Sequence, residues 1–236
     1  MLVACSGGGD SVALTRLLAR LAPELGLELH VATVDHGLRA GSGREALLVA
    51  ALARRLGLDH VTLPVKVAAG SLQAQARVAR YAALRAHARR LGTRRIAVGH
   101  TLDDQAETVL YRALRGAGIE GLAGIAPARR DGVVRPLLDC RRAALRAHLR
   151  HLGETWVEDP SNADPRFARA RLRAFWGELE AIDPRAAEHL AHLADDARAA
   201  RGSLASRARR WQLRAERGGA LRLSVLRAIA PAAASR

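Results

Sequence analysis

Short apolar runs alternate along this chain with longer segments in which apolar residues recur at helical spacing. The runs are rich in Val, Ile and Leu, as in strands that are buried on both faces. The strands are expected at the very start of the chain and near residues 27–34, 59–65 and 94–99, and the helices near residues 12–25, 44–56 and 73–91. Strands separated by helices of this length are typical of βαβ units. The pattern predicts an α/β fold with a doubly wound, mostly parallel sheet.

A different pattern follows Asp183-Pro184, a pair that interrupts a helix. From about Pro184 to Arg217 the chain is rich in Ala, Arg, Glu and Leu at helical spacing. We therefore expect one large α/β domain over residues 1–180, followed by a small, basic helical segment over residues 181–236. The arginines of that segment, such as Arg207, Arg209 and Arg210, form a candidate surface for a polyanion.

The glycine loop, residues Ser6 to Ser11, connects the first strand to the first helix. Its three glycines, Gly7, Gly8 and Gly9, allow several N–H groups to converge on one point at a helix N-terminus, which favours an anion. Ser6 and Ser11 add hydroxyl donors. Asp10 would be out of place beside phosphate unless it caps the helix or holds a metal ion. The loop predicts a site for a polyphosphate with a divalent cation, although a glycine-rich turn can also be a plain strand-to-helix connection.

The spacing of this loop excludes two common nucleotide motifs. A Walker loop needs a lysine that reaches the phosphates, and the only lysine here is Lys66. A dinucleotide fingerprint needs G-x-G-x-x-G, which is absent. Ser-Gly-Gly-x-Asp-Ser after an N-terminal strand resembles instead the loop of the N-type ATP pyrophosphatases, which cleave ATP between its α and β phosphates.

Basic residues exceed acidic residues by 38 to 23, so the formal net charge is +15 and the sequence pI is about 11.5. Such a charge suits a nucleic acid partner. A genome rich in Arg codons explains why lysine is scarce, but it does not explain why basic residues outnumber acidic residues. Aromatic residues make up 3% of the chain, so we do not expect a stacking platform to dominate RNA binding.

Other features of the sequence bear on where in the cell the protein is expected and on the roles of its cysteines. No apolar run approaches the roughly 18 residues of a membrane span, and no signal peptide precedes the glycine loop. We expect a cytoplasmic protein without a membrane partner. Cys5 and Cys140 lie far apart without C-x-x-C spacing, which favours neither a disulfide framework nor a metal cluster.

Acidic and histidine residues follow two of the expected strands, at the edge where the glycine loop also lies. Asp35 and His36 follow the second strand, and Gly99-His100 leads into Asp103-Asp104-Gln105-Ala106-Glu107 after the fourth. Asp104 and Glu107 share one helix face at i, i+3 spacing. They suit an incoming ammonium group or a metal ion, although acidic residues also stabilise a first helical turn on their own.

The helix near residues 73–91 carries a second set of candidates. Arg77, Arg80 and Tyr81 stand at i, i+3 and i, i+4 spacing, so one face presents two guanidinium groups and a ring, with Gln75 nearby. The face suits RNA, and a solvated basic face remains the alternative.

Taken together, these motifs closely resemble the bacterial tRNA(Ile)-lysidine synthase family. The resemblance covers nearly all of residues 2–180. Beyond the motifs above, it includes Tyr111-Arg112, Arg115-Gly116, Gly121-Leu122-Ala123-Gly124-Ile125, Arg135-Pro136-Leu137-Leu138, Trp156 and Asp159-Pro160-Ser161-Asn162.

The resemblance implies an enzyme that adenylates C2 of the wobble cytidine in tRNA(Ile) with a CAU anticodon and then lets L-lysine displace AMP. It implies ATP as co-substrate in the Ser6–Ser11 loop with His36 and His100 close by, and Mg²⁺ on Asp10 and Asp35. Asp104 and Glu107 would hold the lysine, and Arg112 would join Asp10, Asp35, Asp104 and Glu107 as a catalytic residue. The residues expected to contact tRNA are Arg77, Arg80, Arg112, Arg115, Arg171 and Arg173. A homodimer is left open.

Three departures from the family pattern accompany the resemblance. Thr101 stands where a second histidine is common, Ala170 stands where an asparagine is usual, and the chain lacks the C-terminal domains of many members. Two other functions therefore stay open. One is another enzyme with the same loop, such as a tRNA thiolase or a small-molecule amidase or synthetase, and the other is a catalytically weak RNA-binding relative.

Overall fold

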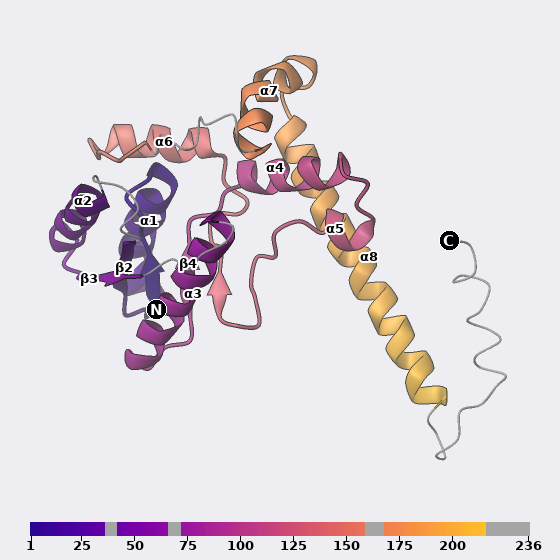
Figure 1. The fold of residues 1–236 in the computed structure, drawn as a ribbon, viewed down its shortest axis with the longest axis horizontal. Coiled ribbons are helices and arrows are strands. Elements are labelled where there is room, and N and C mark those ends of the chain that lie inside the picture. The colour runs from indigo at the N-terminus through magenta and orange to yellow at the C-terminus, as the bar shows by residue number, and fades with distance from the viewer. Residues whose placement is uncertain (36–41, 66–71, 159–167, 216–236) are drawn as a thin grey trace.

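The computed structural model describes residues 1–35, 42–65, 72–158 and 168–215 of the chain. Within these ranges a central sheet carries helices on both faces, and a long helix projects from one side (Figure 1). The strands are β1 (Leu2–Ala4), β2 (His30–Asp35), β3 (Asp59–Pro64), β4 (Ile96–Val98) and β5 (Val133–Val134). The helices are α1 (Gly9–Leu25), α2 (Ser42–Arg55), α3 (Leu72–Arg90), α4 (Leu102–Ala113), α5 (Ile119–Leu122), α6 (Arg142–His151), α7 (Ala168–Ile182) and α8 (Ala186–Ala215).

The sheet has the order β3-β2-β1-β4-β5, and every strand pair in it is parallel. The α/β class and the doubly wound parallel sheet are therefore confirmed. Val3 of β1 lies between Val31 of β2 and Ala97 of β4, which places the first strand at the centre. Because parallel strands end at one edge, the segments after β1 and β4 meet there.

The apolar alternation of the strands supplies a core on each face of the sheet. On one face Val3, Val31 and Ala97 pack against residues of α1, α2 and α6. On the other face Leu2 and Ile96 pack against Leu84 and its neighbours on α3. Strands buried on both faces explain the continuous apolar runs in the sequence.

Among the described residues, the buried apolar side chains of the C-terminal helix α8 lie in its first half. Ala187 and Ala191 join Leu102 and Ala106 of α4 in a third apolar cluster. Every side chain from residue 199 to residue 210 is exposed, and this half of α8 extends away from the α/β part (Figure 1). No helix in the described ranges is long and apolar enough to cross a membrane.

Candidate active site

The glycine loop closes on itself through its two serines. The Ser11 hydroxyl donates to the carbonyl oxygen of Gly8 at 2.8 Å and accepts from the backbone N–H of Ser6 at 3.1 Å. Gly7 has a φ of +86°, a value that favours glycine. Helix α1 begins at Gly9, so its first amides lie within the loop and lack acceptors inside the helix. The loop therefore has the build of an anion site.

Two neighbouring segments fix this loop in place, and each contact depends on a glycine. The carbonyl oxygen of Gly7 accepts from the N–H of Val157 at 2.9 Å, so a segment far along the chain braces the loop. A Cβ on Gly9 would stand 3.3 Å from the ring of Trp156. The end of β4 also meets the loop, because Gly99 packs against the backbone of Asp10 and Ser11.

An acidic cluster, consisting of Asp10, Asp103, Asp104 and Glu107, lies beside the loop. Thr101 starts α4 with a capping box, in which its hydroxyl accepts from the N–H of Asp104 while the Asp104 carboxylate accepts from the N–H of Thr101 at 2.9 Å. The cap directs the first turn of α4 so that Asp104 and Glu107 share one face. Glu107 is buried, with its side chain 3% exposed.

Arg141 pairs with Asp103 of this cluster at 3.4 Å, and two further arginines contact its other carboxylates. Arg142, the first residue of α6, donates to Asp10 at 3.2 Å, to Asp104 at 2.8 Å and to Glu107 at 3.2 Å. Arg173 on α7 donates from Nε to Glu107 at 2.7 Å and from Nη2 to the other oxygen of Glu107 at 3.1 Å. One guanidinium group thus joins the aspartate of the glycine loop to both carboxylates of α4.

Asp10 retains one oxygen for a further ligand. Its Oδ1 is buried and has no hydrogen-bond partner within the described part of the chain. Burial raises the pKa of Asp10, the charge of Arg142 opposes this shift, and the charge of Asp104 adds to it. A buried carboxylate oxygen of this kind fits a divalent cation. Among the described residues no group of three or more His, Cys, Asp or Glu side chains forms a metal centre.

A basic cluster of Arg77, Arg80, Arg129 and Arg135 surrounds Tyr81 and His100. The guanidinium carbons of Arg77, Arg80 and Arg129 lie 5.2, 5.3 and 5.4 Å from the centre of the buried Tyr81 ring. Burial lowers the pKa of both Arg80 and Arg135, and neighbouring arginine charges lower each further. So much positive charge around one ring suits an anionic ligand.

His100 connects the basic cluster to the acidic cluster. Arg135 is buried and donates from Nε to His100 Nδ1 at 3.3 Å. Burial lowers the pKa of His100 to about 4; the charge of Asp104 opposes this shift, and Arg135, Arg77 and Arg80 reinforce it. The imidazole is therefore neutral at pH 7, with Nδ1 as an acceptor.

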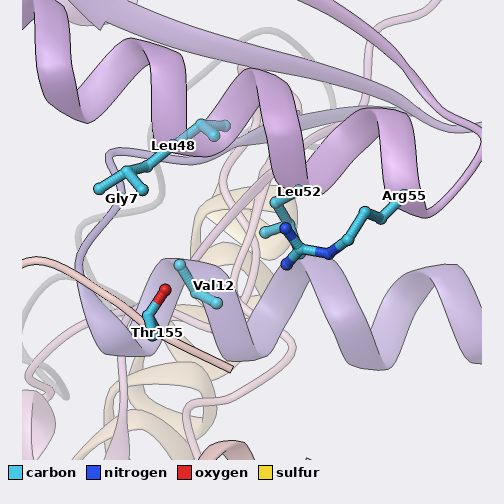
Figure 2. A pocket seen from close by; sticks show the side chains of 7 residues that line it. Gly7, Val12, Leu48, Leu52, Arg55 and Thr155 are labelled. Atoms are coloured by element: carbon cyan, nitrogen blue, oxygen red, sulfur yellow. The ribbon is translucent and has the colours of Figure 1, made fainter. Parts of the chain in front are cut away.

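Figure 2 shows a separate pocket between α1 and α2. Its lining includes Gly7, Val12, Leu48, Leu52 and Thr155. Its cavity volume is about 20 Å³, far below the roughly 300 Å³ at which ligand pockets begin. We therefore do not place a nucleotide there.

The arrangement of loop, sheet edge and acidic residues has counterparts in known proteins. The PP-loop domain family matches residues 1–179 of this chain. The chain belongs to the PP-loop family.

Curated relatives of this PP-loop chain carry one name. The tRNA(Ile)-lysidine synthase of Bradyrhizobium sp. is 49% identical over 221 residues, which are 89% of this chain and 62% of the relative. The enzyme of the same name from Ruegeria pomeroyi is 54% identical over 176 residues, 72% of this chain and 42% of the relative. These findings confirm the family resemblance of the motifs. The chain spans less than two thirds of the length of these relatives.

A solved structure supports the PP-loop fold. The U34-tRNA thiolase of Methanococcus maripaludis, with its [4Fe-4S] cluster, matches with a TM-score of 0.68 at 17% identity, over 83% of this chain and 71% of that chain. At this identity the likeness concerns the fold.

The structure brings most of the predicted residues of the PP-loop site together, but Arg112 and Arg115 have other contacts. Asp35 ends β2, at the same edge as the glycine loop, and His36 lies outside the described residues. Arg112 donates to the carbonyl oxygens of Gly121 and Gly124, so it holds the α5 turn. Arg115 donates to the Tyr111 hydroxyl at the far end of α4.

The remaining predicted residues lie on α7. Both Arg171 and Arg173 were predicted to contact tRNA. Arg171 is exposed, whereas the guanidinium group of Arg173 donates to the Glu107 carboxylate. The two departures in the family pattern have structural roles, because Thr101 caps α4 and Ala170 is buried. Sequence reasoning missed Arg142 altogether. A basic residue at the start of a helix interacts unfavourably with the helix dipole. That unfavourable position was the one signal in the sequence that Arg142 has a special role.

Proposed function

We propose that this PP-loop chain carries the catalytic part of a tRNA(Ile)-lysidine synthase. The observation that supports it best is the convergence of Asp10, Asp104 and Glu107 on the single guanidinium group of Arg142. A cation site directly beside a polyphosphate site suits the joining of an amine to an acceptor that ATP has activated. The relatives named above carry this activity in their names.

In the proposed reaction the wobble cytidine of tRNA(Ile) attacks the α-phosphorus of ATP, and pyrophosphate leaves. The amides of the glycine loop and the hydroxyl of Ser6 would bind the departing phosphates, an electrostatic role. Asp10 and Asp35 would hold Mg²⁺, which neutralises charge on the phosphates when bound. The unpartnered Oδ1 of Asp10 supports this assignment.

In the second step the amine of L-lysine attacks C2 of the activated cytidine, and AMP leaves. Asp104 and Glu107 would hold the ammonium end of the lysine, and a carboxylate at this position can accept the proton that the attacking amine must lose. Much of the rate would come from placing the two reactants together.

The basic cluster on α3 would bind the RNA or its adenylate phosphate. Arg77 is exposed, while Arg80 and the buried Arg135 extend the positive charge toward His100. Phosphate contacts by arginine position a nucleic acid without reading its sequence. Arg115, stacked 5.6 Å from the centre of the Tyr111 ring, offers a further contact at the end of α4.

The thiolase alternative receives less support from the two cysteines. Sulfur transfer requires thiolates, and burial raises the pKa of both Cys5 and Cys140.

The decisive assay is the incorporation of labelled lysine into a tRNA(Ile) transcript with a CAU anticodon, combined with ATP–pyrophosphate exchange. Lysine transfer supports the proposal. Exchange without lysine transfer would favour another PP-loop enzyme, and tRNA binding without either activity would favour an RNA-binding relative.

A further inference from the structure

Arg142 occupies an unusual position for a basic residue at the start of a helix. Its backbone N–H donates to Asp103 at 2.6 Å, which fixes the first turn of α6 against α4. Its side chain is 18% exposed and lies among three carboxylates from two different elements. Burial alone would lower the pKa of Arg142, but the charges of Asp104, Asp10 and Glu107 outweigh that effect and raise it. The guanidinium group is therefore held charged.

The carboxylates expected to bind an ammonium group are already occupied. Oδ1 of Asp104 accepts from Arg142, and Oδ2 caps the N–H of Thr101. Oε1 of Glu107 accepts from both Arg142 and Arg173, and Oε2 accepts from Arg173. An ammonium group has three donors to satisfy, so it cannot bind this pair fully while both guanidinium groups remain.

The charges at this point nearly balance. Asp10, Asp104 and Glu107 contribute three negative charges, and Arg142 and Arg173 contribute two positive charges. The arrangement is stable without a ligand but leaves little net attraction for an incoming cation. Removal of one guanidinium charge from the pair would restore that attraction.

Only Arg142 connects the pair to the glycine loop within the described contacts. Its Nε donates to Asp10, whereas Arg173 donates to Asp104 and Glu107 at this site. A polyphosphate in the loop would bring anionic oxygens next to this guanidinium group and compete for it. The nucleotide would then weaken the hold of Arg142 on Asp104 and Glu107.

We infer that Arg142 is the specificity-determining residue that makes the amine site depend on the nucleotide site. Without nucleotide, its guanidinium group takes the place of the substrate ammonium between Asp104 and Glu107. With nucleotide bound, the group turns to the phosphates and the carboxylate pair becomes available. Amine binding therefore follows nucleotide binding. The inference rests on the proposed function, since it takes L-lysine as the amine.

The test measures lysine affinity by calorimetry, with and without α,β-methylene ATP and Mg²⁺, on the full chain without tRNA. For the wild type we expect the nucleotide to tighten lysine binding by roughly 5- to 150-fold, the usual range of coupling between sites. For Arg142→Gln we expect lysine to bind tighter than to the wild type when nucleotide is absent, with the coupling reduced to less than about 2-fold.

Arg146→Gln is the matched control, because it removes a positive charge one turn further along α6 that pairs with the exposed Glu158 and affects Asp10 less than Arg142 does. It should keep the wild-type coupling. Thermal unfolding of both variants checks the fold. If Arg142→Gln does not fold, the wild type still tests the inference, because lysine binding that does not tighten when nucleotide is added would overturn it.

The outcomes separate the inference from the proposed function. Wild-type protein that binds lysine equally well with and without nucleotide overturns the inference alone. So does Arg142→Gln protein that binds lysine no better than the wild type in the absence of nucleotide. Wild-type protein that does not bind lysine under either condition overturns lysine as the substrate, and the inference with it.

Discussion

Gly99 lies so close to the first turn of α1 that a Cβ at this position would stand 3.0 Å from the carbonyl oxygen of Asp10. The same Cβ would stand 3.1 Å from the Cα of Ser11. Both contacts are with backbone atoms, which cannot turn aside as a side chain can. The end of β4 and the glycine loop therefore fit together only with glycine at position 99.

Gly99→Ala should displace the glycine loop. We expect a loss of roughly 1–3 kcal/mol in the free energy of unfolding, as for other overpacked sites. ATP affinity should fall as well, because the amides of the loop no longer converge. Gly177→Ala on α7 is the control, since a Cβ there meets no atom within 4 Å. Unchanged nucleotide affinity in Gly99→Ala would show that the loop tolerates the shift.

Asp104→Asn should separate lysine use from ATP use. The substitution removes the charge but keeps an oxygen that can cap Thr101, so the start of α4 should survive. We expect lysine incorporation at limiting lysine to fall roughly 10- to 100-fold, the cost of a lost bond to a charged group, while nucleotide binding persists. Glu120→Gln, at an exposed carboxylate on α5, should change neither activity. Equal loss of lysine use and nucleotide binding would refute the assignment of Asp104 to lysine.

Acid should destabilise the protein through His100. Above pH 6.5 this side chain is neutral in both the folded and the unfolded chain, so it adds no pH dependence. Between about pH 6.5 and pH 4 the unfolded chain takes up a proton that the folded chain refuses, because burial and neighbouring arginines lower the folded pKa to about 4. Stability is therefore lost as the pH falls through this window.

His100→Asn tests this directly by denaturant unfolding across that pH range. Asparagine keeps an acceptor for Arg135 but does not titrate. Relative to the variant, the wild type should lose up to about 3 kcal/mol more between pH 6.5 and pH 4. Parallel curves for the two proteins would mean that His100 titrates normally.

The projecting half of α8 should contribute to tRNA binding through phosphates. Arg207, Arg209 and Arg210 are exposed there, and no acidic residue occurs from residue 197 to residue 215. Replacement of all three by Ala should weaken tRNA affinity and reduce the slope of log K against log salt by about 1 to 3 units.

The control for this prediction replaces three exposed arginines of the α/β part, Arg20, Arg54 and Arg90. The net charge changes equally in the two triple variants, so a general charge effect would lower both affinities alike. A salt slope that is the same in the α8 variant and the wild type would contradict phosphate contacts by α8.

Local sequence was enough to predict the parts of the fold that depend on local rules. The apolar runs placed β2 and β3 to within a few residues, and the glycine loop fell between β1 and α1 as expected. Either Thr101 or Asp103 could cap the helix that follows β4, and the structure has Thr101 in that position. The two-residue strand β5 was not foreseen, because so short a strand has no periodicity to detect.

The ion pairs of the site could not be predicted from local sequence patterns. Arg142 and Asp10 are 132 positions apart, and Arg173 and Glu107 are 66 apart. A local pattern cannot distinguish these two arginines from the many others in so basic a chain. The packing of α6 against α1 and of α7 against α4 selects them.

The bracing of Gly7 by Val157 has a consequence for the order of events during synthesis. The glycine loop leaves the ribosome well before the segment that holds it, which follows about 150 residues later. A nascent chain that has formed β1, β2 and β4 would still lack Trp156 and Val157 beside the loop. The nucleotide site should therefore mature only after Val157 has been made, although the glycine loop itself is made much earlier.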